Sequence, residues 1–162
     1  MLRHLFAAVV FCSSLSASAE SLVEANMDWL TSHQEYVDNA LTSEQSKDFL
    51  PVLNTVIAVW ERRDGALTAE ISPLILQAII AEPELTFDAL HDNPKSFNRW
   101  LKQLQGQVFT AINPDQVQPL NDLKMELETS LSSYIIHPDA PFKKQAKRLL
   151  EQVQAISVYM VD

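Results

Sequence analysis

Apolar residues recur at helical spacing along most of the chain beyond residue 20. The clearest stripe, in residues 94–112, consists of Phe97, Trp100, Leu101, Leu104, Val108 and Ile112. Steps of three and four residues place such side chains on one face of an α-helix. Strict alternation of β-branched residues is absent, and two glycines, Gly65 and Gly106, provide little turn chemistry for hairpins. The pattern therefore predicts an all-α protein.

Prolines and caps mark the expected helix boundaries. Asn93 and Asn113 each precede a proline, and Asn followed by Pro suits the N-cap and the first position of a helix. Pro51 indicates a kink or a restart, and Gly65 suits a helix end. These marks predict about seven helices: Ser21–Leu41, Thr42 or Ser43 to Arg63, Ser72–Ala81, Pro83–His91, Pro94–Ile112, Pro114–Ile136 and Asp139–Val161.

Short connections between these helices predict antiparallel packing of successive helices. Residues 72–81 are apolar almost all round, which is typical of a central helix. The chain has no internal repeat of the length used by helical solenoids. We therefore expect an irregular antiparallel helical bundle, with a short helix-pair solenoid as the alternative. Trp60 and Trp100 fit apolar stripes and are expected in the core, whereas Trp29 and Tyr36 are expected to be partly exposed.

The first nineteen residues have the pattern of a cleavable signal peptide. Arg3 precedes an apolar run from Leu5 to Cys12, and Ala17-Ser18-Ala19 matches a signal peptidase site. The apolar run is much shorter than the roughly 20 residues of a membrane-spanning helix. Cleavage before Glu20 is expected to leave residues 20–162 as a single all-helical domain without cysteine. These features predict an exported protein, located in the bacterial periplasm or secreted.

The composition of the expected mature chain limits its partners. It has 11 basic and 21 acidic residues, and 11 − 21 gives a net charge of −10. Such acidity argues against binding to nucleic acid and against docking on anionic lipid. No later apolar run reaches membrane-spanning length, so stable membrane insertion after cleavage is not expected. A basic or neutral protein partner is the expectation.

Candidate catalytic and metal-binding patterns are weak. Asp88 and His91 are three apart and could bind a metal on one helix face, but the di-iron pattern needs a second copy. The sequence has neither the Cys-x-x-Cys-His motif that attaches haem nor the Gly-x-Ser-x-Gly motif of a nucleophilic serine. Glu126 and Glu128 are two apart and point in different directions on a helix. The sequence therefore predicts no catalytic, cofactor or metal residue.

Acidic residues are concentrated in the first half of the expected mature chain. Residues 20–92 have 3 basic and 14 acidic side chains (3 − 14 = −11), whereas residues 93–162 have 8 and 7 (8 − 7 = +1). Glu84, Asp88 and Asp92 recur every four residues, with Glu82 just before them. A basic patch in the last helix consists of Lys143, Lys144, Lys147 and Arg148. The two patches are either solvated faces that complement each other within the molecule or surfaces for a partner.

The hypothesis that follows is a non-enzymatic interaction module of the periplasm. Glu82, Glu84, Asp88 and Asp92 form the candidate face, which would attract a basic protein partner. An inhibitor or immunity protein and an accessory subunit of an envelope complex are two concrete forms. Two alternatives remain open: a carrier that holds a small apolar ligand between its helices, and an enzyme whose site assembles from distant residues.

Overall fold

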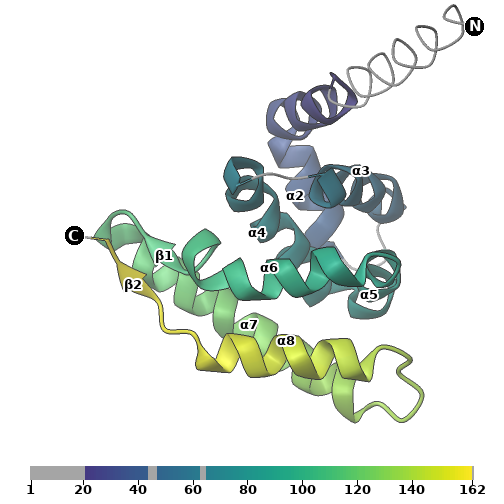
Figure 1. The fold of residues 1–162 in the computed structure, drawn as a ribbon, viewed down its shortest axis with the longest axis vertical. Helices are drawn as coiled ribbons and strands as arrows, with labels where there is room; N and C mark the ends of the chain where they lie inside the picture. Colours follow the sequence, from purple (N-terminus) through teal and green to yellow (C-terminus); the bar gives the residue numbers. More distant parts are fainter. Residues whose placement is uncertain (1–20, 44–46, 63–64, 162) are drawn as a thin grey trace, which may run out of the picture.

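The computed structural model describes residues 21–43, 47–62 and 65–161 (Figure 1). The expected signal peptide and its cleavage before Glu20 lie outside the described residues. In the part that is described, every helix is too short or too polar to cross a bilayer.

The described chain is almost entirely helical, as the apolar spacing predicted. Its elements, in chain order, are a helical segment at residues 21–32, α2 (Gln34–Thr42), α3 (Phe49–Arg62), α4 (Gly65–Ala81), α5 (Pro83–His91), α6 (Pro94–Gln107), β1 (Thr110–Ala111), the 3-10 turn η1 (Pro114–Gln116), α7 (Val117–Ile136), α8 (Lys143–Ala155) and β2 (Tyr159–Met160). The two strands form one short parallel sheet. The all-α bundle predicted from the sequence is confirmed.

The helix α4 lies at the centre of the bundle. It packs against α2, α3, α5, α6 and α7, and Ile71, Ile75, Leu76 and Ile79 are fully buried. A helix that is apolar nearly all round gains most free energy where neighbours cover every side. The expectation for residues 72–81 is therefore confirmed. These side chains belong to one connected cluster of buried hydrophobic residues, whose members range from Leu30 to Ile156 in the sequence.

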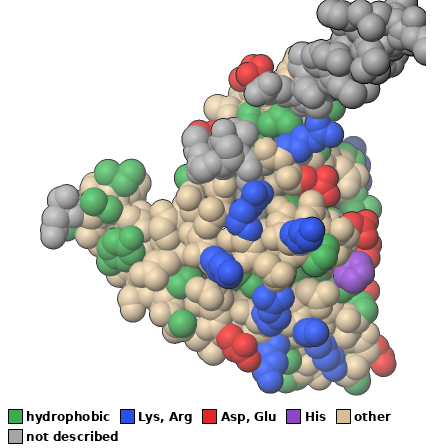
Figure 2. Space-filling view, viewed as in Figure 1, with side chains coloured by type: hydrophobic (Ala, Val, Ile, Leu, Met, Phe, Trp, Pro, Cys, Tyr) green, Lys and Arg blue, Asp and Glu red, His purple; other side chains and the backbone are tan. Residues whose placement is uncertain are grey.

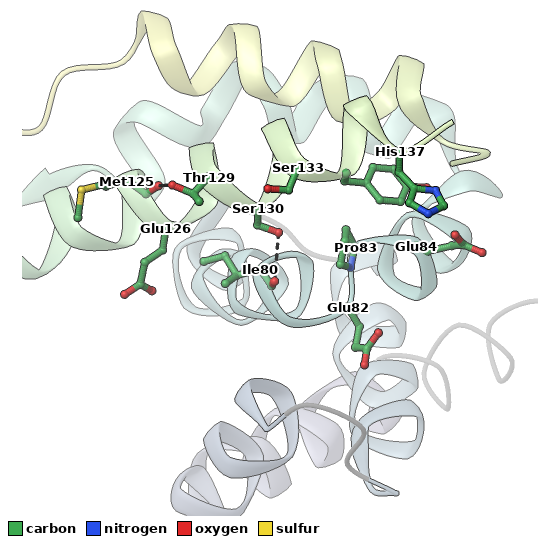
Figure 3. A pocket seen from close by; sticks show the side chains of 11 residues that line it. Ile80, Glu82, Pro83, Glu84, Met125, Glu126, Thr129, Ser130, Ser133 and His137 are labelled. Atoms are coloured by element: carbon green, nitrogen blue, oxygen red, sulfur yellow. Dashed lines mark hydrogen bonds between the residues drawn. The ribbon is translucent and has the colours of Figure 1, made fainter. Parts of the chain in front are cut away.

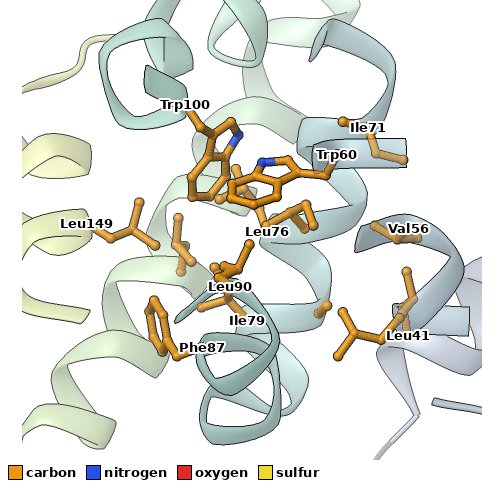
Figure 4. Packing of buried hydrophobic residues seen from close by; sticks show 14 of the residues in the cluster. Leu41, Val56, Trp60, Ile71, Leu76, Ile79, Phe87, Leu90, Trp100 and Leu149 are labelled. Atoms are coloured by element: carbon orange, nitrogen blue, oxygen red, sulfur yellow. The ribbon is translucent and has the colours of Figure 1, made fainter. Parts of the chain in front are cut away.

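Two tryptophans anchor the middle of the core, as predicted. Trp60 on α3 and Trp100 on α6 are fully buried, and their rings meet edge to face with centroids 6.4 Å apart (Figure 4). The indole N–H of Trp100 donates a 2.9 Å hydrogen bond to the buried hydroxyl of Ser72 on α4. This bond satisfies a polar group that would otherwise be costly to bury.

The helices α7 and α8 form an antiparallel pair. β1 lies shortly before α7, β2 lies shortly after α8, and Thr110 of β1 pairs with Tyr159 of β2. The start of α7 and the end of α8 are therefore at the same end of the molecule, at the left of Figure 1. This arrangement confirms the antiparallel packing predicted for this pair.

Several predicted boundaries were wrong in the first half of the chain. The predicted helix Ser21–Leu41 is interrupted at His33, where the imidazole Nδ1 is 2.9 Å from the carbonyl oxygen of Trp29 and the backbone turns. Thr42 and Ser43 end α2 instead of capping the next helix, which begins at Phe49. Pro51 lies in the first turn of α3, in agreement with the restart predicted there. At the end of α2 the Thr42 hydroxyl donates to the carbonyl of Asp38, which is a local competition of a side chain for a backbone acceptor.

Gly65 begins α4 instead of ending the preceding helix, and α4 continues through Pro73. An internal proline removes one backbone hydrogen bond and costs about 3 kcal/mol. Burial of the apolar side chains on both sides of Pro73 offsets that cost, so tertiary packing overrides local propensity.

Two predicted helices end early. The predicted helix to Ile112 ends at Gln107, where the Thr110 hydroxyl donates to the carbonyl of Gln105, and the predicted helix to Val161 ends at Ala155. The chain then becomes extended, because β1 and β2 pair with each other. The last predicted helix also begins later, at Lys143, since Pro141 disfavours helical backbone at the residue before it.

Candidate functional site: an acidic groove along α7

A proline between α4 and α5 creates the backbone geometry of the site. In a continuous helix the carbonyl of Ile79 would accept from the N–H of residue 83, but that residue is Pro83. The hydroxyl of Ser130 on α7 lies 3.3 Å from the Ile79 oxygen and 3.1 Å from the Ile80 oxygen, and donates to them. Ser130 therefore fixes α7 against the end of α4 (Figure 3).

We expect Ser130→Ala to lower the free energy of unfolding by about 1 kcal/mol, the usual contribution of one hydrogen bond. The loss arises because two carbonyls at the end of α4 lose their donor. Denaturant unfolding followed by circular dichroism measures it. Ser133→Ala is the matched control on the same helix, because Ser133 is exposed. Equal stability of the two variants would contradict this role of Ser130.

A groove of about 690 Å³ opens between α7 on one side and the α4–α5 junction on the other. We call it the acidic groove, and its lining residues are Ile80, Glu82, Pro83, Glu84, Met125, Glu126, Thr129, Ser130, Ser133, Tyr134 and His137. Three of them are glutamates, and no lysine or arginine of the described chain is among them. Ile80, Pro83 and Met125 add apolar surface. The groove thus combines negative charge with hydrophobic contact.

The three carboxylates lie at separate points around the groove. Figure 3 shows Glu126 near one end, Glu84 near the other, and Glu82 on the α4–α5 side. In the described part of the chain, no three acidic, histidine or cysteine side chains are placed to bind a metal ion together. Such spacing favours contact with several positive charges of an extended ligand over capture of a single ion.

Tyr134 forms the inner wall next to Glu84. Its hydroxyl accepts a 3.2 Å hydrogen bond from the N–H of Phe142, and its ring lies 5.9 Å from that of Phe87. Burial raises the pKa of the Tyr134 phenol above its ordinary value of 10.0, and the negative charge of Glu84 raises it further. The hydrogen bond from Phe142 acts in the opposite direction. The phenol therefore stays neutral at physiological pH and contributes a polar, uncharged surface.

A second hollow, of about 540 Å³, continues the groove toward the start of α7. It shares Ile80 and Glu126 with the acidic groove and adds a fourth carboxylate, Asp122. At 1.5 Å per residue, the part of α7 from Asp122 to its end at Ile136 spans about 21 Å. The two hollows together give a trough that is long enough for a helix of about four turns.

The structure divides the four predicted partner-binding residues into two pairs. Glu82 and Glu84 line the acidic groove. Asp88 and Asp92 are exposed farther along α5 and are not among the residues that line it. Glu84 is in the first turn of α5, where the helix dipole favours an acidic side chain. Part of the predicted face therefore belongs to the groove, and part does not.

Sequence reasoning missed the contribution of α7. The polar residues Glu126, Ser130, Ser133 and His137 follow one another at steps of four, three and four. They lie beside the buried stripe of Leu127, Leu131 and Tyr134. Such a polar stripe is a visible signal, but it resembles an ordinary solvated face. Nothing in the sequence says that the α4–α5 junction lies opposite it.

His91 is an ordinary helix-end residue in the structure. Its ring lies 5.6 Å from that of Phe142, and its Nδ1 is 3.5 Å from the amide nitrogen of Gln145. Trp29 and Tyr36 are close, with ring centroids 6.0 Å apart, and Tyr36 is exposed as expected.

The acidic and basic patches do not neutralise each other through ion pairs. Among the described residues, the only ion pair within 4.0 Å joins Lys124 and Glu128 on α7. The hypothesis of direct intramolecular pairing between Glu84, Asp88 or Asp92 and the basic residues of α8 finds no support in this geometry. The side chains of Glu84, Asp88 and Asp92 are exposed to solvent.

No protein-family model, curated protein or solved structure matches the chain.

Proposed function

We propose that the protein is a non-enzymatic interaction module of the bacterial periplasm and that its acidic groove binds a basic segment of a partner protein. The observation that carries the proposal is the set of separated carboxylates around a trough with apolar surface, with no lysine or arginine among the described residues that line it. Apolar contact supplies affinity, and the carboxylates select a positively charged ligand.

The dimensions of the trough favour an amphipathic helix as the bound segment. The bound segment that we expect is a helix of about four turns. Its basic residues would face Glu84 and Glu126, and its apolar residues would face Ile80 and Met125. An inhibitor, an immunity protein and an accessory subunit are each compatible with this kind of contact. The groove is open along its length, so a protein segment fits better than a small ligand that must be enclosed.

Charge reversal tests the groove against a control on the same chain. The double variant Glu84→Lys/Glu126→Lys changes two groove carboxylates, whereas Asp88→Lys/Asp92→Lys makes the same net charge change outside it. The probe is a fluorescent helical peptide with lysines and leucines on one side, and binding is measured by anisotropy. We expect the groove variant to bind at least about tenfold more weakly, which corresponds to about 1.4 kcal/mol.

The control variant should bind within about threefold of the wild type, because Asp88 and Asp92 do not line the groove and make no direct contact with a segment bound in it. Circular dichroism checks that both variants are folded. If both lose affinity equally, binding depends on net charge and the groove is not the site. If neither does, the proposal is wrong. A bound small molecule found by native mass spectrometry of the purified wild type would favour the ligand-carrier alternative.

A further inference from the structure

A second charged surface, opposite in sign, lies on α6 and α8. We call it the basic face, and its residues are Lys95, Arg99, Lys102, Lys143, Lys144, Lys147 and Arg148. The two helices pack against each other. Figure 2 shows lysine and arginine side chains spread over this side of the molecule, with acidic side chains toward its edges. The face is positive although the whole chain is acidic.

Few acidic groups oppose these cations. The sequence of α6 has no Asp or Glu, and α8 has Glu151 alone. None of the seven cations forms an ion pair within the described chain. The Arg148 guanidinium lies 5.9 Å from the centroid of the Phe97 ring, which holds it between the two helices. The two helices therefore have an excess of positive charge on this face, with Glu151 as their acidic residue.

An exposed apolar surface lies just beyond the C-terminal ends of α6 and α8. β1 follows α6 and β2 follows α8, and the strands bring together what we call the apolar tip: Ile112, Tyr159, Met160 and Val161. Their exposed fractions are 78%, 44%, 47% and 52%. The N–H of Val161 donates a 3.0 Å hydrogen bond to Ala111, which places it beside Ile112. Large apolar side chains exposed together favour contact with another apolar phase.

We propose that the basic face and the apolar tip together dock the protein on the surface of an anionic bilayer. A bilayer with phosphatidylglycerol offers both parts of the complementary surface, because anionic headgroups attract lysine and arginine and the hydrocarbon receives apolar side chains. Nucleic acid and acidic proteins also carry negative charge, but they do not offer a hydrocarbon phase that would receive the apolar tip. The contact is peripheral, because no helix of the described residues is long and apolar enough to cross the membrane.

The overall negative charge does not prevent this contact. Screening over about 8 Å at physiological salt makes the nearest charges dominate, and on this side they are cations. The opposite expectation from the sequence rests on a net charge that averages over all faces. Asp115, on η1 near the apolar tip, and Glu151, on α8 beside the basic face, are acidic residues that oppose docking.

Vesicle sedimentation with residues 20–162 tests the proposal. We expect binding to vesicles of phosphatidylcholine with phosphatidylglycerol, and none to phosphatidylcholine alone. The triple variant Arg99→Gln/Lys102→Gln/Lys147→Gln should reduce the partition coefficient about a hundredfold, or about 3 kcal/mol at 1.4 kcal/mol per tenfold. The matched control Lys47→Gln/Arg62→Gln/Lys124→Gln removes the same charge away from the face and should bind nearly as well as the wild type.

The apolar tip has its own test. Ile112→Ser/Met160→Ser should weaken vesicle binding about tenfold without changing its salt dependence, whereas Asp115→Asn should strengthen it. Equal effects of the two triple variants, or tight binding of single-stranded DNA that the tip variant leaves unchanged, would overturn the proposal. Absence of binding to the anionic vesicles would also overturn it. None of these outcomes depends on the acidic groove, so the two proposals fail separately.

Discussion

Trp100→Ala is expected to lower the free energy of unfolding by about 3–5 kcal/mol, the usual cost of truncating a fully buried aromatic residue. The indole of Trp100 is fully buried, packs on Trp60, and is bonded to Ser72. Its loss leaves a cavity where α3, α4 and α6 meet. Because a domain of this size is stable by only about 5–15 kcal/mol, the variant should melt at a much lower temperature.

Trp29→Ala is the natural comparison, because it removes the same side chain from a partly exposed position. It should cost about 1 kcal/mol, typical of positions outside the core. Urea unfolding followed by far-ultraviolet circular dichroism avoids the change in tryptophan fluorescence. If Trp100→Ala costs no more than Trp29→Ala, the central position of Trp100 is wrong.

The fold was predictable to the extent that it depends on regular spacing. The stripes of α6 and α7 and the apolar surface of residues 72–81 identify the helices and the core, since burial follows periodicity directly. The caps were predictable where the signal is local: the Asn93 side chain accepts from the N–H of Ser96, as expected before Pro94. Asn113 makes no such bond at the start of η1.

The misplaced boundaries have a common physical reason. Ile112 and Met160 continue the stripes of their helices in the sequence, but both are exposed in the structure. Extended pairing of β1 with β2 competes with the last helical turns, and it joins segments that are about fifty residues apart. A periodic pattern records local preference and contains no information about such distant pairing.

The candidate site shows the same limit. Charge density in residues 82–92 was visible, and Glu82 and Glu84 were identified. What selects them over Asp88 and Asp92 is the position of α7, whose Ser130 bonds to the end of α4. The basic face likewise becomes visible only when α6 and α8 lie together. The sequence therefore predicts the pattern within one helix, but it does not predict surfaces that form where two helices pack together.

Phe87→Ala is expected to have an effect of similar size, and it links the core to the groove. Phe87 is fully buried, and its ring lies 6.4 Å from that of Phe97 on α6 and 5.9 Å from that of Tyr134 on α7. It thus holds α5, with Glu84, against the groove-forming helix. Truncation should cost about 3–5 kcal/mol. It should also weaken binding of the basic peptide while the protein is still folded.

Leu85→Ala separates the two effects, because Leu85 is on the same helix but is 40% exposed. We expect it to cost less than about 1 kcal/mol and to leave peptide binding unchanged. Phe87→Leu, which keeps most of the apolar volume, should restore much of the free energy of unfolding and much of the affinity for the peptide. Thermal unfolding and anisotropy on the same samples measure them. If Phe87→Ala destabilises the fold but binds the peptide as tightly as the wild type, α5 does not position the groove, and the role assigned to Glu84 falls with it.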